Sequence, residues 1–238
     1  ERRAFDECQS LKEITIPSSV KEIGEYCFNR CKNLTMIEFP SSMTSIKQHM
    51  CSECTSLIEI IIPSSITTIE NHAFSKCSSL KQISIPSSVK SIGSGAFEKC
   101  SSLTKFEIPS LMTLISKHML DGCTSLKEII IPSSITKIED YSFKGCISLE
   151  EINIPKSVLY LNQNAFEECS SLKKIDVPSN IIKKSSLLRK YELSSTVTSI
   201  TQYMLDKYTK IEEVIIPTSV TFIGDFSFNE FKTLKQII

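Results

Sequence analysis

The chain lacks several features that mark common classes of protein. It has no tryptophan, six glycines and three histidines among its 238 residues. No run of eighteen apolar residues is present, so we expect no membrane span. Lysine plus arginine and aspartate plus glutamate each number 27, which leaves no basic excess to neutralise phosphates. A nucleic-acid partner is therefore not expected.

The sequence also lacks the motifs of catalysis and of secretion. A Gly-rich phosphate loop, a nucleophile elbow and a paired-acid motif are missing, so we expect neither an enzyme nor a cofactor. The N-terminal residues 1–5 are not followed by the apolar run of a signal peptide. Because the chain begins without Met and inside a repeated pattern, we expect a fragment of a longer protein. Its compartment, cytoplasm or cell surface, stays open.

What the chain does have is an internal repeat. Its hydrophobic share of 41% is too high for a disordered chain. Prolines recur every 23 residues, and the surrounding text reads L-x-x-I-x-I-P-S-S-[VI]-x-x-I-x-x-x-[A/M]-F-x-x-C-x-S. The prolines in this register are Pro17, Pro40, Pro63, Pro86, Pro109, Pro132, Pro155 and Pro178. Such a period predicts a solenoid, in which stacked coils bury one continuous core.

Each part of the unit has a physical interpretation. The alternating L-x-x-I-x-I segment predicts a short strand, and proline, which has no N–H to donate, ends it. The two serines form a corner and the V-x-x-I segment returns along the opposite side. The A-F-x-x-C segment is typical of a short helical turn with its phenylalanine facing inward. Strands of neighbouring coils then pair in a parallel sheet, about 4.8 Å apart.

Phenylalanine and cysteine occupy fixed columns of the repeat. The position eleven residues after each proline is mostly phenylalanine, and we interpret it as a packed spine rather than an aromatic box for a cofactor. A cysteine stands fourteen residues after each proline, from Cys31 to Cys169, and Cys8 fits the same column. One cysteine per coil indicates small buried hydrophobes in the reduced state. A disulfide or a metal site, for example at Cys51-x-x-Cys54, is the alternative.

Two further patterns have mainly structural interpretations. His49, His72 and His118 share one column, where a metal pair lacks a third ligand, so we expect exposed, solvated rings. The glycosylation sequon that begins at Asn33 partly overlaps a predicted strand and is discounted. A sequence similar to that around His49 recurs three units later around His118, which indicates duplication of a three-unit block.

The repeat is irregular at residues 178–193. The coil there is seven residues shorter than the others, and Ser194 takes the proline position. We predict a kink or bulge at this coil. Its basic cluster is interpreted as a solvated surface, with a docking point as the alternative; the cluster comprises Lys173, Lys174, Lys183, Lys184, Arg189 and Lys190.

The unit resembles the BspA-like, or Treponema pallidum-type, class of leucine-rich repeats, and its Ser-rich wording resembles the versions in parasitic protozoa. The residues that carry the resemblance are clearest in Ile83, Ile85-Pro86, Ile92-Gly93, Ala96-Phe97 and Cys100. It implies a curved solenoid with the parallel sheet on its concave side, and roles in adhesion, host-matrix contact or protein–protein interaction. The predicted fold is thus an α/β leucine-rich-repeat solenoid of about ten 23-residue coils, with short helical or extended turns on the outer side. We expect residues 1–238 to form one domain that is truncated at both ends.

The strand side is the predicted binding surface. Side chains two residues before each proline should point out of the sheet. That column is rich in carboxylates with isolated isoleucines, which suits a protein partner, a host-matrix or cell-surface protein among them. The predicted protein-binding residues are Glu38, Ile61, Glu107, Ile130, Asn153, Asp176 and Glu192. The alternative is a self-assembling module that forms homo-oligomers through open strand edges.

Overall fold

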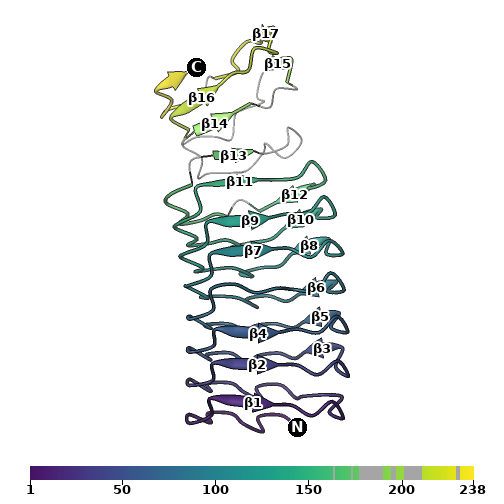
Figure 1. Cartoon of the computed structure of the whole chain (residues 1–238). Helices are drawn as coiled ribbons and strands as arrows, with labels where there is room; N and C mark the ends of the chain where they lie inside the picture. The colour runs from purple at the N-terminus through teal and green to yellow at the C-terminus, as the bar shows by residue number, and fades with distance from the viewer. Residues whose placement is uncertain (163, 173, 177–189, 194–196, 201–210, 229–230) are drawn as a thin grey trace.

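The chain folds as a solenoid of stacked coils, which Figure 1 shows from the N-terminus to the C-terminus. The computed structural model describes residues 1–162, 164–172, 174–176, 190–193, 197–200, 211–228 and 231–238, without the side chains of 174–176 and 190–192. Most of the described coils have two strand segments and a side made of turns. The predicted solenoid with parallel strands and 23-residue coils is confirmed.

One column of strands follows the L-x-x-I-x-I segments. Neighbours pair in parallel with a register of one repeat, as in Glu13↔Met36 and Met36↔Glu59. In the three-residue strands with described side chains, the middle residue is buried or partly buried, and Ile37 and Phe106 are fully buried. The strands are β1 (Glu13–Thr15), β2 (Met36–Glu38), β4 (Glu59–Ile61), β7 (Lys105–Glu107), β9 (Glu128–Ile130), β11 (Glu151–Asn153), β13 (Lys174–Asp176), β14 (Lys190–Glu192), β16 (Glu213–Ile215) and β18 (Gln236–Ile237). We call the outward surface of β1 to β11 in this column the long-strand face.

A second column of two-residue strands lies on the returning side of the coils (Figure 1). Its strands form at the V-x-x-I segments, where one isoleucine, such as Ile46 or Ile69, is buried. They are β3 (Ser45–Ile46), β5 (Thr68–Ile69), β6 (Ser91–Ile92), β8 (Leu114–Ile115), β10 (Lys137–Ile138), β12 (Tyr160–Leu161), β15 (Ser199–Ile200) and β17 (Phe222–Ile223). The two columns enclose the core between them.

The third side of each coil is a ladder of turns. In one coil, the N–H groups of His72, Phe74 and Lys76 donate to carbonyls of the next coil at 2.9, 2.9 and 2.6 Å. Equivalent bonds join coil to coil from Arg3 N–H to Gly145 N–H. We call these bonds the turn ladder. They alternate with bonds inside the coil, such as that from Ser75 N–H to the His72 carbonyl, so successive backbone donors of this side are satisfied by the next coil and by their own coil in turn.

The turn ladder replaces the short helical turn that the sequence suggested. Two residues per coil have a positive φ, for example His72 at 53° and Lys76 at 62°, and such residues interrupt a right-handed helix. Glycine takes these positions in some coils, as at Gly122 and Gly145, where φ is 73° and 66°. The residues that the structure describes contain no helix, and thus none that could cross a membrane.

The core is the predicted spine of phenylalanines. The Phe74 and Phe97 rings stack with centroids 5.5 Å apart, and both side chains are fully buried. Where Cys51 replaces phenylalanine in the spine, Phe39 of the same coil is buried and lies 6.4 Å from Phe74. Where Leu120 replaces phenylalanine in the spine, Phe106 of the same coil is buried, and its ring centroid lies 5.1 Å from that of Phe97. The large ring therefore moves from the turn side to the strand side, which keeps the core filled.

The irregular coil at 178–193 falls mostly outside the described residues, and so does the predicted kink there. Strands β13 and β14, which flank it, are neighbours in space although they are 16 residues apart in sequence. The side chains of the basic cluster are likewise outside the described residues.

Candidate binding face

The long-strand face carries the predicted binding residues. Glu38, Glu107 and Asn153 are exposed at the ends of β2, β7 and β11. Ile61 and Ile130 end β4 and β9, and each is 40% exposed, which is unusual for isoleucine in a strand. Asp176 and Glu192 end β13 and β14, but their side chains lie outside the described residues. The predicted outward direction is confirmed for the five described side chains.

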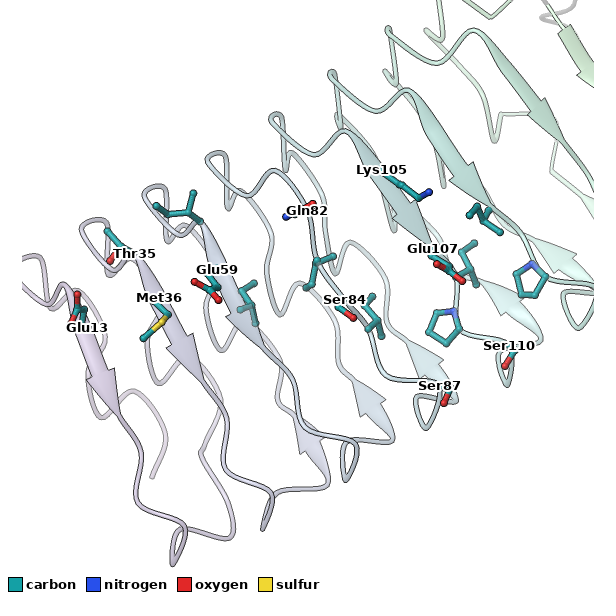
Figure 2. Close-up of a pocket in the computed structure, with 18 residues that line it drawn as sticks. Glu13, Thr35, Met36, Glu59, Gln82, Ser84, Ser87, Lys105, Glu107 and Ser110 are labelled. Atoms are coloured by element: carbon teal, nitrogen blue, oxygen red, sulfur yellow. The ribbon is translucent and has the colours of Figure 1, made fainter.

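An open groove of about 1080 Å³ runs along this face from β1 to β9. Figure 2 shows side chains of successive coils, from Glu13 to Lys105, projecting toward its open side. Its lining mixes carboxylates with aliphatic groups: Glu13, Met36, Ile58, Glu59, Ile60, Gln82, Ile83, Ser84, Ile85, Lys105, Glu107, Ile108, Pro109, Ile130 and Pro132 are among its residues. Of the predicted set, only Glu107 and Ile130 line it. An open groove this long suits an extended macromolecular segment better than an enclosed small molecule.

The sheet is interrupted at the middle of the groove. Residues 82–84 stand where the repeat predicts a strand, but they are not in a strand, and β4 and β7 on either side belong to separate sheets. Ile83 and Ile85 are only partly buried there, whereas the corresponding Ile37 is fully buried. A second interruption separates β9 from β11. The first break therefore brings the apolar groups Ile83 and Ile85 to the groove floor.

The sequence did not reveal these breaks, although it held a signal for them. They follow β4 and β9, and these strands end three units apart in the duplicated block, at Ile61 and Ile130. On the returning side, β8-β10-β12 continues past the second break, whereas β3-β5-β6 ends at the coil of residues 82–84, so this side also divides between β6 and β8. The three-unit period thus predicts where the sheet divides, and the 23-residue period alone does not.

The charges on the groove are mainly negative. Lys105 Nζ lies 2.8 Å from Glu128 Oε1, which raises the pKa of the lysine and neutralises its charge locally. Glu13, Glu59 and Glu107 are exposed, and none makes an ion pair within the described part of the chain. The groove therefore presents carboxylates to solvent above a partly aliphatic floor.

The cysteine column lies away from the groove and has a structural role. The thiol of Cys77 donates to the carbonyl of Cys51 at 3.2 Å, and that of Cys100 donates to the carbonyl of Phe74 at 3.2 Å. Burial raises the pKa of the Cys100 thiol to about 12, so it stays protonated and unreactive. The ten cysteines are free, and the predicted burial is confirmed for six members of the column, from Cys31 to Cys146.

The histidine column covers the turn ladder. The His49 ring stacks between Tyr26 and His72, with centroids 4.6 and 4.8 Å away. His118 stacks on Tyr141, and its Nδ1 lies 2.7 Å from Asp121 Oδ2. The rings are thus partly buried in a stack, and not simply solvated as expected. Among the described residues, no group of three histidine, cysteine or acidic side chains is placed to hold a metal ion.

A parallel solenoid with a 23-residue coil, one strand and one turn ladder per coil, defines the class of leucine-rich repeats. The model of the BspA-type leucine-rich repeat region matches residues 1–127, 90–187 and 180–238. The chain belongs to this family. Repeats of this kind are generally non-catalytic modules that bind proteins or lie at surfaces.

The chain is similar to several solved structures of leucine-rich repeat proteins. A leucine-rich cell surface protein of Faecalibacterium prausnitzii is 29% identical, with a TM-score of 0.64 over 95% of this chain and 69% of that one. A leucine-rich repeat protein of Bacteroides ovatus is 21% identical, with a TM-score of 0.58 over 100% of this chain and 87% of that one. The T. pallidum leucine-rich repeat protein is 28% identical, with a TM-score of 0.46 over 58% and 77%. Comparison with curated proteins gives no match.

Proposed function

We propose that the chain is a non-catalytic module that binds a protein partner through its long-strand face. The observation that carries this proposal is the open groove of about 1080 Å³ on that face, with partly buried isoleucines on its floor. Exposed aliphatic groups ringed by charge are typical of protein-binding surfaces. Five predicted residues, Glu38, Ile61, Glu107, Ile130 and Asn153, are proposed as contacts on this surface, and Asp176 and Glu192 as further contacts in the same strand column at β13 and β14.

Panning a display library of random peptides and small folded domains against the purified chain tests the face. We expect the Ile61→Ala/Ile130→Ala double variant to weaken the selected clones at least tenfold, because each isoleucine removed costs about 1–2 kcal/mol of contact. Leu159→Ala is the matched control, since Leu159 is 72% exposed on the returning side. The proposal would be contradicted by clones whose affinity is unchanged by the double variant but is lowered by Leu159→Ala.

The finer identity of the partner is also a proposal. The relative from F. prausnitzii is described as a cell surface protein, which supports a role of this chain in surface adhesion. Adhesion to a host-matrix protein stays a prediction from the family resemblance. The resemblance to repeats of parasitic protozoa stays a prediction from the serine-rich sequence of the repeat. A binding assay on purified matrix proteins, with the double variant as control, measures the first of these directly.

Self-association is the second candidate. Phe222 and Phe226 are 60% and 63% exposed on the last coil, which favours contact with another apolar surface. Light scattering across a range of concentrations distinguishes the two candidates. A particle that stays monomeric at high concentration excludes self-association and leaves the binding proposal intact.

A further inference from the structure

We infer that the groove takes an extended, cationic segment of a partner protein that lies along the solenoid axis with two basic residues three positions apart. This inference rests on the proposed function and adds the chemistry and conformation of the occupant. It follows from three features of the groove: its charge, the spacing of Glu13 and Glu59, and the lack of a continuous apolar stripe in the outward column that lines it.

The charge of the groove selects a cationic partner. Glu13, Glu59 and Glu107 are exposed and lack an ion pair within the described residues, while the one lining lysine, Lys105, is held by Glu128 at 2.8 Å. Complementary charge across an interface favours the matching partner and excludes like-charged ones. Lysine or arginine side chains would therefore meet free carboxylates here, and acidic segments would be repelled.

The spacing of the carboxylates sets the spacing of the cations. Glu13 and Glu59 are two register steps apart in one column, through Met36. Two steps of the sheet span about 9.6 Å. Three residues of a polyproline chain make one full turn, span about 9.3 Å and return the side chain to the same side. A segment of this conformation that runs across the strands thus places two side chains, three positions apart, above Glu13 and Glu59.

The outward column of the lining has no continuous apolar stripe along the axis, which favours an extended chain over a helix. From coil to coil this column reads Glu13, Met36, Glu59 and Gln82, so Met36 is its one apolar member over these steps of about 4.8 Å. An amphipathic helix presents a continuous apolar stripe instead. Residues between the cations would contact Met36 and Ile58, and beyond Glu59 the segment reaches Ile83 and Ile85 at the sheet break.

Two nine-residue peptides of identical composition test this inference. One is Lys-Leu-Pro repeated three times, which favours the polyproline conformation; the other has its three lysines in a row. We expect the spaced peptide to bind about tenfold more tightly in fluorescence anisotropy, from about a threefold gain at each of two matched carboxylates. Equal binding of the two peptides, or preferential binding of a helical peptide with lysines seven residues apart, overturns the inference.

A pair of matched variants locates the peptide. Glu59→Gln should weaken the spaced peptide about threefold, and Glu13→Gln/Glu59→Gln about tenfold. Glu151→Gln should leave binding unchanged, because Glu151 is exposed in the same column on β11 but does not line the groove. An equal loss in Glu59→Gln and Glu151→Gln contradicts docking in the groove.

Failure of the inference is distinguishable from failure of the proposed function. If neither peptide binds, but displayed clones still depend on Ile61 and Ile130, the cationic segment is wrong and the binding face stands. If the clones are also indifferent to Ile61→Ala/Ile130→Ala, both are wrong.

Discussion

The turn side and the long-strand face of the same coils differ in regularity. On the turn side, equivalent hydrogen bonds join coil to coil from Arg3 to Gly145. On the long-strand face, the sheet divides at residues 82–84 and again between β9 and β11. The difference shows that the 23-residue period specifies the turns and the core more strictly than it specifies strand pairing. Irregularity is concentrated on the side where we place the binding groove.

The largest effect is expected from removing a ring of the spine, which supports both sides. Phe97→Ala should destabilise the chain by about 3–5 kcal/mol, because a fully buried ring leaves a cavity against Phe74 and Phe106. Urea unfolding measures the change. The exposed Leu159→Ala control should lie within about 0.5 kcal/mol of the unchanged chain, and similar losses in both variants would contradict the spine.

A smaller effect should distinguish the turn ladder from ordinary turns. Lys76 has φ of 62°, and Gly122 and Gly145 occupy the same column. Lys76→Val should cost about 1–2 kcal/mol because β-branched side chains are strained in this region. Lys76→Gly should leave the free energy of unfolding nearly unchanged, since the strain relieved offsets the added freedom of the unfolded chain. A valine variant as stable as the glycine variant would show that the left-handed backbone is not required.

Much of this fold could be predicted from the sequence, because the period places identical environments at identical offsets. Pro63, Phe74 and Cys77 identify a strand end, a core ring and a buried thiol by column alone. The left-handed turns could not be predicted in this way, since Tyr26, His49 and Lys76 have no common side-chain signature. The groove was missed because residues 80–85 keep the strand pattern L-x-x-I-x-I and yet do not form a strand. Of the binding face, only the outward direction of the side chains two residues before each proline could be predicted, because side chains alternate between the two faces of a strand.

Restoring the sheet at its break should have a modest effect. Ser84 is exposed within the interruption, and valine there has the higher strand propensity. Ser84→Val should therefore stabilise the chain by up to about 1 kcal/mol and slow amide exchange at residues 82–85. Unchanged stability and exchange would mean that packing below the break, rather than the propensity of residues 82–84, divides the sheet.

The smallest effect should come from the stacked histidines on the turn side. Burial, and then the neighbouring His72, lower the pKa of His49 below its ordinary value of 6.5. Because the unfolded chain takes up the proton first, stability is full above pH 6.5 and falls as the pH drops below it. His49→Tyr keeps a ring of the type found at Tyr26 and should flatten this dependence. An unchanged pH profile of thermal unfolding would contradict the assignment to His49.

The most direct test of the central claim is hydrogen–deuterium exchange with and without a bound clone from the display library. Binding in the groove should slow exchange at residues 58–60, 82–85 and 105–108, while amides of the turn ladder at residues 72–76 and 95–99 should be protected in both states. Protection that appears on the turn side, with no change at residues 82–85, would contradict it.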